Sequence, residues 1–240
     1  MSLDGTASER KETAAPQPFQ HLLFVWLSPS FPTGAFAYSH GLEMASERGL
    51  VTDRAQLQDW LAALISHGSV HNDLILLAAT HRAGIAQDAA SLAAINALAL
   101  ALQPSAERYL ETTQQGGSFL LGVAASWPHA TLTTLRTHLG PDVAYSVALG
   151  LAAAAHAIPL DATLTAFAFA FLTNLTSAAI RLGIVGQTAA QDVIAALTPA
   201  LQTAASAATA SSLDDLGSAT FSADLCSLEH ETQYSRLFRS

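Results

Sequence analysis

Apolar residues recur along most of this chain with the spacing of amphipathic helices. The clearest stripe lies on one helix face, at i, i+3, i+4, i+7 and i+8: Leu57, Trp60, Leu61, Leu64 and Ile65. Further runs predict helices over the ranges 69–83, 88–103, 105–125, 129–139, 141–157, 160–182 and 187–210. The long alternation of apolar and polar residues that is typical of strands is missing. We therefore predict an all-α fold, a single-domain bundle of roughly eight to ten helices.

Both ends of the chain differ in composition from this helical part. Residues 1–18 mix charges of both signs with Pro and Thr and lack the apolar stretch of a signal peptide, which predicts a disordered tail. Residues 211–240 begin with a Ser-, Asp- and Gly-rich stretch and end with aromatic residues and arginines. We expect a helical domain over 19–210, followed by a flexible linker and a tail that docks on a partner, on the helical body, or on both. Once docked, Tyr234, Leu237 and Phe238 are expected to form a helical turn.

The middle of the chain carries very little charge. Asp161 is the only charged residue between Asp142 and Arg181, so by length alone two membrane spans fit in this region. The runs are rich in Ala, Thr, Ser and Gly, are broken by Pro159, and have no Lys or Arg beside Asp142 to set an orientation. We interpret them as buried helices of the bundle, and expect no membrane association and a cytoplasmic location.

The composition favours a protein that uses large interfaces. Half of the residues are hydrophobic and only 12% are charged, against about 25% in an average soluble protein, so other parts of the chain or a partner must cover much of its surface. We therefore expect a homodimer. The net charge of -9 opposes binding to nucleic acid. The single lysine, Lys11, lies in the N-terminal tail, so the lysine of a P-loop is missing.

Two pairs of residues have the i, i+4 spacing of metal ligands on a helix. His67 and His71 form the first pair but have no third ligand, and Cys226 and His230 form the second in a segment expected to be flexible. The single cysteine also excludes a disulfide within the chain and a cysteine-cluster metal site. We predict neither a bound metal ion nor a cofactor.

The sequence also lacks a typical catalytic motif. No G-x-S-x-G nucleophile turn occurs. Ser39, His40 and Glu43 lie close together in sequence, but neighbouring residues point to different sides of a helix. We predict that the chain is not an enzyme.

The densest group of special residues is SPSFPTGAFAYSHGLE, residues 28–43. Its two prolines precede a helix that we predict from Gly34 to Arg48, with Gly49 just beyond its C-terminal end. Gly34 and Gly41 are seven residues apart and would share a helix face that another backbone can approach closely. We expect a tightly packed element with a polar, exposed edge.

Three blocks in the same order resemble the UreF family of urease accessory proteins: SPSFPTGAFAYSHGLE at 28–43, AAIRLGIVGQTAAQ at 178–191 and HETQYSRLFRS at 230–240. The segment RYLETTQQGGS at 108–118 matches as well, so the resemblance extends from Leu22 to Ser240. It implies a non-enzymatic, all-helical protein that dimerises. It further implies a bridge between a scaffold, called UreD or UreH, and the GTPase UreG, which together deliver nickel to apo-urease.

The matched residues are the candidates for partner contacts. His40 and Glu43 are expected to form a partner surface or to line a nickel route, and the other candidates are Arg181, Gln187, Glu231, Tyr234, Arg236, Leu237, Phe238 and Arg239. Two alternatives stay open. In one, the chain regulates GTP turnover by UreG, with Arg181 or Arg239 entering the UreG active site. In the other, the chain itself carries nickel through its histidines.

Overall fold

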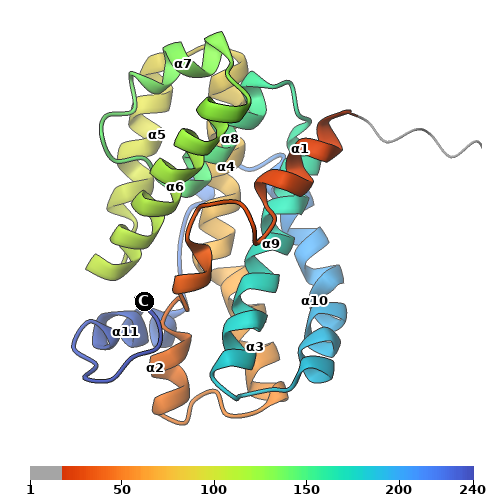
Figure 1. Ribbon diagram of the computed structural model, residues 1–240, viewed down its shortest axis with the longest axis vertical. Helices are drawn as coiled ribbons and strands as arrows, with labels where there is room; N and C mark the ends of the chain where they lie inside the picture. Colours follow the sequence, from red (N-terminus) through yellow and green to blue (C-terminus); the bar gives the residue numbers. More distant parts are fainter. Residues whose placement is uncertain (1–17) are drawn as a thin grey trace, which may run out of the picture.

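The computed structural model describes residues 18–240 and arranges them as a bundle of helices without a strand (Figure 1). The α-helices are α1 (Pro18–Trp26), α2 (Leu42–Glu47), α3 (Arg54–His67), α4 (Ser69–Ile85), α5 (Ala89–Ala101), α6 (Ala106–Ser126), α7 (Ala130–Arg136), α8 (Tyr145–Ala155), α9 (Leu160–Arg181), α10 (Gln187–Ala208) and α11 (Phe221–His230). Two short 3-10 turns, η1 (Ala35–Ala37) and η2 (Leu213–Asp215), complete the set. The predicted all-α class is confirmed. The predicted N-terminal tail lies outside the described residues, except for Pro18.

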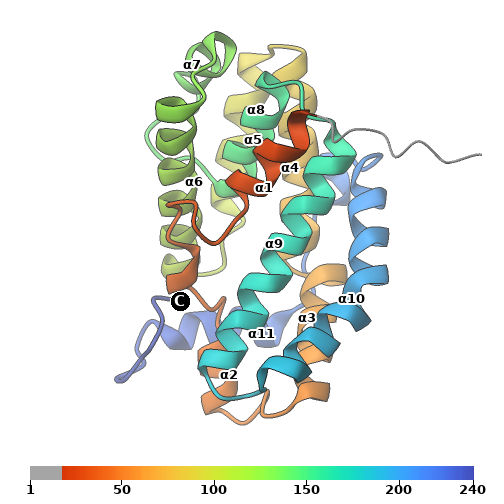
Figure 2. The same cartoon turned by 45° about the vertical axis from the view of Figure 1, so that its right-hand side comes forward.

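Helix α4 forms the centre of the bundle and is buried along most of its length. It packs on α8, α5, α3 and α9, while α10 lies along α9 and α3, and α6 lies against α8 (Figures 1 and 2). The contact between α4 and α8 is close because Gly150 faces the backbone of α4. A Cβ added at Gly150 would lie 2.7 Å from the Leu77 carbonyl oxygen. The apolar stripes of several helices thus converge on one core.

The helix boundaries lie close to the predicted ranges because polar residues cap the helices. Asp53 accepts a hydrogen bond from the Gln56 amide at the start of α3, and Ser105 accepts one from the Arg108 amide at the start of α6. Such caps satisfy amides that have no partner within the helix. The start of a helix is therefore visible in the sequence as well as in the structure.

Two helical stretches are long and apolar enough to cross a membrane by length and composition: Arg54–Ile85, which comprises α3 and α4, and α9. Within the bundle, 61% and 50% of their apolar windows are buried. Helix α8, which lies in the same charge-poor region as α9, is buried from Ser146 to Ala154. These helices use their apolar faces to build the core, as expected for buried helices.

The helix predicted from Gly34 to Arg48 is wrong. Gly34, His40 and Gly41 have φ angles of 77°, 56° and 75°, in the left-handed region that interrupts a helix, so of this stretch only α2 is α-helical. Gly49, with φ of 71°, follows the end of α2 as predicted. Since residues 39–41 are not helical, side chains that a helix would separate can face the same neighbours.

The segment that we expected to be a linker and tail is packed on the body of the protein. The Ala219 amide donates to the His67 carbonyl over 2.8 Å, and α11 then packs on α2 and α6. Residues 231–240, which we call the tail, form turns without a helix, so Tyr234, Leu237 and Phe238 do not share a helical turn here. Docking on the helical body was one of the expected arrangements, and the structure shows it.

Candidate functional site

Gly41 brings α2 against α11. A Cβ at this position would lie 3.0 Å from the Ser227 amide nitrogen, and the backbone is left-handed there, so glycine fits where other residues would be strained. The close approach that we predicted for both glycines is found at Gly41, whereas Gly34 has no such neighbour within 4 Å. The contact places the start of the tail beside α2 (Figure 1).

Glu43 faces the tail and not the solvent. Its side chain accepts hydrogen bonds from the Leu237 amide over 2.6 Å and from the Phe238 amide over 2.8 Å. The residue is buried, so it does not form the exposed edge that we expected. Glu43 therefore fixes where the tail crosses α2.

His230, at the end of α11, lies between two carboxylates. Its Nε2 atom is 3.1 Å from Glu43 Oε2 on α2, and its Nδ1 atom is 2.6 Å from Glu107 Oε2 on α6. The imidazole is fully buried. Glu107 also binds Arg236 of the tail. These four side chains join α2, α6, α11 and the tail in one network of charges.

The end of the tail has further anchors. The Arg239 amide donates to the Ala37 carbonyl over 2.8 Å, and the Ser39 amide donates to the Ser240 carbonyl over 2.7 Å. The Ser240 hydroxyl donates to Glu111 over 2.9 Å. The tail is thus attached to the loop before α2 on one side and to α6 on the other.

Glu111 is the most strongly perturbed carboxylate of this region. Burial alone raises its pKa, but the Arg108 guanidinium, His40 and the Ser240 hydroxyl outweigh that effect and lower the pKa to about 2. His40 lies 2.9 Å from Glu111, and burial together with Arg108 lowers the pKa of its imidazole. Like Glu43, His40 is turned inward, with only 10% of its side chain exposed.

Arg181 is stacked between two aromatic rings. Its guanidinium lies 3.6 Å from the Phe36 ring centre and 4.3 Å from the Phe238 ring centre, and it donates to the Phe36 carbonyl over 2.7 Å. Burial lowers the pKa of this guanidinium. Arg181 therefore joins α9 to both the loop and the tail.

Of the remaining candidate residues, Glu231 helps to anchor the tail, whereas Arg239 and Gln187 are exposed at the surface. Glu231 accepts from the Ala106 amide over 2.8 Å at the start of α6, where a carboxylate is favoured by the helix dipole. Arg239 is exposed; its guanidinium lies beside the Tyr38 hydroxyl and makes a loose contact of 3.5 Å with Gln114. Gln187 begins α10, is exposed, and takes part in none of the side-chain hydrogen bonds found among the described residues. The structure does not bring Gln187 into the tail network.

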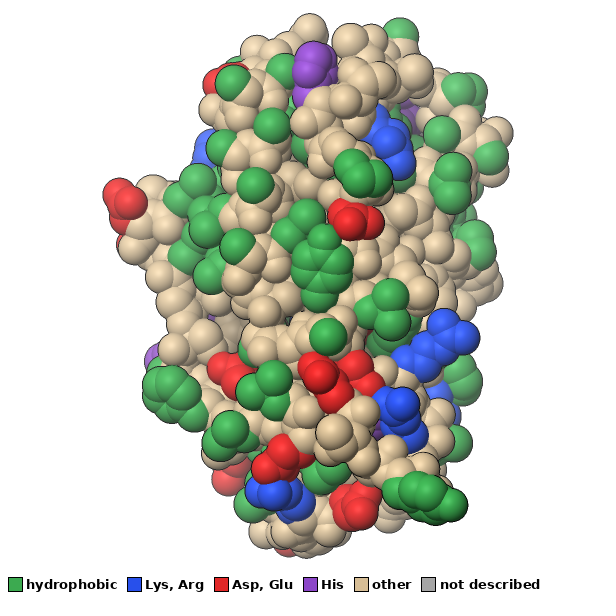
Figure 3. Space-filling view, turned by 90° about the vertical axis from the view of Figure 1, so that its left-hand side faces the viewer, with side chains coloured by type: hydrophobic (Ala, Val, Ile, Leu, Met, Phe, Trp, Pro, Cys, Tyr) green, Lys and Arg blue, Asp and Glu red, His purple; other side chains and the backbone are tan. Residues whose placement is uncertain are grey.

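An apolar strip remains uncovered next to this network. Phe221, Leu225 and Leu228 follow one another at i, i+4 and i+7 on the outer face of α11, with exposures of 72%, 56% and 45%. The tail adds Tyr234, which is fully exposed, and Leu237, which is 63% exposed. Figure 3 shows the side of the molecule that is on the left in Figure 1, where α11 and the tail lie. On the lower part of this side, hydrophobic side chains are exposed among acidic ones. Exposed apolar side chains in a row are typical of a protein-binding surface.

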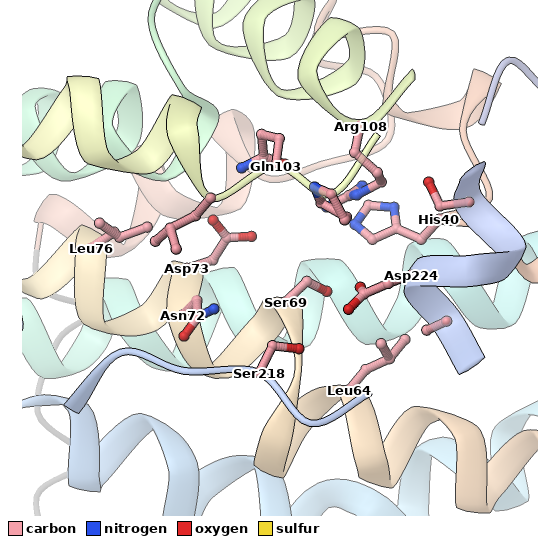
Figure 4. A pocket seen from close by; sticks show the side chains of 14 residues that line it. His40, Leu64, Ser69, Asn72, Asp73, Leu76, Gln103, Arg108, Ser218 and Asp224 are labelled. Carbon is pink, nitrogen blue, oxygen red and sulfur yellow. The ribbon is translucent and has the colours of Figure 1, made fainter. Parts of the chain in front are cut away.

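Two cavities flank the loop before α2. The larger, about 200 Å³, lies between this loop, α6 and α9, and the smaller, about 70 Å³, lies between α4 and α11. His40, Asp73 and Arg108 line both. Figure 4 shows Asp73 and Asp224 on the wall of the smaller cavity. Burial raises the pKa of Asp73 to about 6 and also raises that of Asp224.

The metal-ligand pairs suggested by the sequence do not form a metal site. Gly68 separates α3 from α4, so His67 and His71 lie on different helices, and His71 Nε2 is 3.0 Å from the Asp215 carbonyl oxygen. Both ring nitrogens of His230 face carboxylates. Within residues 18–240, no group of three or more His, Cys, Asp or Glu side chains is placed to hold a metal ion.

The Ser39, His40 and Glu43 side chains do not form a nucleophile with its base. The Ser39 hydroxyl donates to the Ser240 carbonyl, and Glu43 accepts from tail amides. His40 contacts Glu111 instead of Ser39. These polar side chains connect residues 39–43 with the tail and with α6.

The residues of α6 that take part in this network were not identified from the sequence. Arg108 and Glu111 lie in the RYLETTQQGGS segment, and Glu107 directly precedes it, but none was assigned a role. A signal was available, because Glu107 and Glu111 are four residues apart and so share a helix face. What faces them from α2, α11 and the tail depends on contacts between distant parts of the chain.

Comparison with known proteins identifies relatives over almost the whole chain. A family model described as UreF matches residues 51–198. The chain is 54% identical over 229 residues to the urease accessory protein UreF of Azorhizobium caulinodans, covering 95% of this chain and 98% of that protein. It is 54% identical over 218 residues to the protein of the same name from Methylobacterium radiotolerans (91% and 95% covered), and 48% identical over 242 residues to that of Rhodopseudomonas palustris strain BisB5 (98% and 100%).

Proposed function

This chain belongs to the UreF family of urease accessory proteins, and on that premise we propose that it is a non-enzymatic adaptor in urease maturation. In this proposal it bridges the UreD or UreH scaffold and the GTPase UreG, so that the complex inserts nickel into apo-urease. It does so in the cytoplasm and as a homodimer, in keeping with its low content of charged residues.

The observation that carries this proposal is the uncovered apolar strip on α11 and the tail. Phe221, Leu225 and Leu228 are exposed together with Tyr234 and Leu237, while the polar groups beneath them are bound to one another. Apolar anchors with a polar rim are typical of protein-protein interfaces. We assign this surface to the scaffold.

The polar groups of the site support an adaptor role over catalysis. Glu43, Glu107 and His230 bind one another and the tail, and Ser39 binds Ser240. A catalytic group needs access to a substrate and a free donor or acceptor. Here the same groups hold a docking segment in position.

Regulation of UreG is the second candidate function, and the exposure of Arg239 favours it. Of the two arginines that we considered, Arg181 is stacked between rings while Arg239 is available at the surface. An arginine that enters a GTPase active site raises turnover by roughly 10³- to 10⁵-fold. Turnover by UreG alone, with this protein, and with its Arg239→Ala variant separates regulation from bridging.

The experiment that tests the adaptor role is capture of purified scaffold, and then of UreG, by this chain. The variant Leu225→Asp places a charge in the middle of the strip and should weaken scaffold capture at least about tenfold. Deleting residues 228–240 should abolish capture and urease activation, with helix content nearly unchanged. The mass of the wild-type complex should show two copies of this chain.

A matched control is Leu121→Asp, because Leu121 is 70% exposed on α6 outside the strip. This variant should capture the scaffold as the wild type does. Normal capture by Leu225→Asp and by the deleted protein would contradict the assignment of the surface.

A further inference from the structure

The larger cavity, about 200 Å³, is lined by α6, the start of α8, α9 and the loop between α1 and α2. In Figure 2 this loop crosses between α6 and α9. Pro29, Gly34 and Phe36 of the loop and Thr173 of α9 line the cavity and are exposed, so the cavity reaches the surface. An apolar cavity of about 150 Å³ in another protein binds benzene. The space is therefore large enough for a small ring compound and has an entrance.

Two side chains on the cavity wall have hydrogen-bond donors that the protein does not use. The Tyr145 hydroxyl, at the start of α8, has no partner among the described residues, and burial raises its pKa. Arg108 on α6 is only 6% exposed, and within residues 18–240 its Nη1 atom alone is hydrogen-bonded, to Glu111. Buried donors normally have a partner. These two therefore favour a ligand with a hydrogen-bond acceptor.

Two amide side chains on the same wall have unused acceptors. Gln115, one α6 face with Arg108 and also 6% exposed, donates through Nε2 to Glu111 over 3.0 Å, but its oxygen accepts no bond from the described residues. Asn174 on α9 donates through Nδ2 to the Ala35 carbonyl over 3.2 Å, and its oxygen likewise has no donor within residues 18–240. A ligand that also donates hydrogen bonds would satisfy both oxygens.

Aromatic rings form much of the remaining wall. Phe31 of the loop and Phe167 of α9 are buried, and Phe171 lies one turn further along α9. Trp26, at the end of α1, completes this group. Flat apolar rings pack well against a flat ligand.

The charged groups around the cavity favour a neutral ligand. Arg108 is paired with Glu111, and Asp73 lines the cavity as well. His40 also lines it, but burial and Arg108 lower the pKa of its imidazole, so that it adds no positive charge. An anion would face two carboxylates and a cation would face the guanidinium. Burying an ion beside a like charge is costly.

We propose that this cavity binds a neutral, planar ring compound with an amide-like edge, of the class of the pyrimidine and purine bases. Arg108 and Tyr145 donate to a ring carbonyl, Gln115 and Asn174 accept from ring N–H groups, and the aromatic side chains cover the faces of the ring. The site is distinct from the apolar strip on α11, and binding at it does not depend on the adaptor function.

The test is ligand-observed NMR of the purified full chain with four small ring compounds. Uracil and hypoxanthine carry amide edges, toluene has no polar group, and benzoate is an anion. At about 1 mM probe, which detects weak ligands of this size, uracil and hypoxanthine should bind and benzoate should not. Binding of toluene alone, or of benzoate more tightly than uracil, would overturn the proposed ligand class. Binding of none of the four would overturn the site.

Tyr145→Phe removes the unused hydroxyl and keeps the ring. The midpoint of thermal unfolding should not fall, because no hydrogen bond within the described residues is lost. Binding of uracil should weaken about fivefold, as expected for one hydrogen bond. The matched control is Tyr109→Phe, since the Tyr109 hydroxyl is 3.0 Å from Asp142 and outside the cavity, and this variant should bind uracil as the wild type does.

A second variant, Ala170→Leu, adds side-chain volume to the cavity from α9 and should abolish binding of uracil and hypoxanthine. Unchanged affinity in folded Ala170→Leu would show that the probes bind elsewhere and would overturn the site. Unchanged affinity in Tyr145→Phe would overturn the proposed contacts, and this result does not require Ala170→Leu to fold. Weaker binding in both variants, with Tyr109→Phe unaffected, supports the proposal.

Discussion

The core between α4 and α8 and the docked tail are held by different forces. In the core, Leu77 is fully buried and the two helices approach each other over Gly150. In the tail, ten residues without regular structure are held mainly by Glu43, Glu107 and Glu111 of the body. Apolar packing in the core is spread over many contacts, whereas the tail depends on a few directional bonds and on one buried apolar side chain, that of Phe238. The tail can therefore open while the core stays folded.

The largest expected effect is in the core. Leu77→Ala removes a fully buried side chain from α4 and leaves a cavity, which should lower the free energy of unfolding by about 3 to 4 kcal/mol. Denaturant unfolding followed by circular dichroism measures this loss. The exposed Leu121 is the control, and Leu121→Ala should change stability by less than about 0.5 kcal/mol. Similar losses in both variants would contradict the location of the core.

Acidification should weaken the tail region through Glu111. Its pKa in the folded protein is about 2, below its ordinary value of 4.5, because Arg108, His40 and Ser240 outweigh burial. The stabilisation is therefore complete above the ordinary value and is lost as pH falls from about 5 to 2, by roughly 3 kcal/mol. Unfolding measured from pH 6 to pH 2 should show this loss in the wild type and not in Glu111→Gln. Asp192→Asn, an exposed change on α10, should leave the pH dependence intact. If the pH dependence of unfolding is the same in Glu111→Gln as in the wild type, Glu111 is not the cause of the loss of stability in acid.

The smallest effect is expected at Arg181, which connects the core helix α9 to the tail. Arg181→Lys keeps the charge but loses the planar stacking on Phe36 and Phe238, and should cost about 1 kcal/mol. The change should appear as faster amide exchange at Phe238 with little change in the midpoint of thermal unfolding. Arg54→Lys, at an exposed position at the start of α3, is the control. An unchanged exchange rate at Phe238 would show that the stacking does not hold the tail.

The helices could be read from the sequence because their signals are local. The stripe around Leu57 and Trp60 gave α3, and the caps Asp53 and Ser105 marked helix starts that the structure shows. The helix expected from Gly34 failed because three left-handed residues interrupt it, and the aromatic and apolar residues around them are compatible with either arrangement. Helix α11 was taken for a linker because its Ser and Asp content is typical of loops.

Only part of the candidate site could be predicted from the sequence, because its residues come from distant segments of the chain. Tyr234, Arg236, Leu237, Phe238 and Arg239 were singled out in the tail by resemblance, but the carboxylates that receive this segment lie on α2 and α6, far away in sequence. Glu43 and His40 were expected at a surface. Instead, Glu43 is buried and the His40 side chain is only 10% exposed, because the turn at residues 40–41 directs them inward, toward α11 and α6 respectively.

The sequence by itself determined the all-α class, the limits of most helices and the membership of the family, since periodicity, caps and motifs are carried by neighbouring residues. Only the tertiary structure decided that Glu43, Glu107 and His230 meet, that Arg181 is stacked between rings, and that the strip on α11 stays exposed. The physical reason is that charge pairing and burial depend on which distant segments are packed together. The energy of a buried carboxylate is set by what surrounds it, and the residues next to it in the chain do not specify those surroundings.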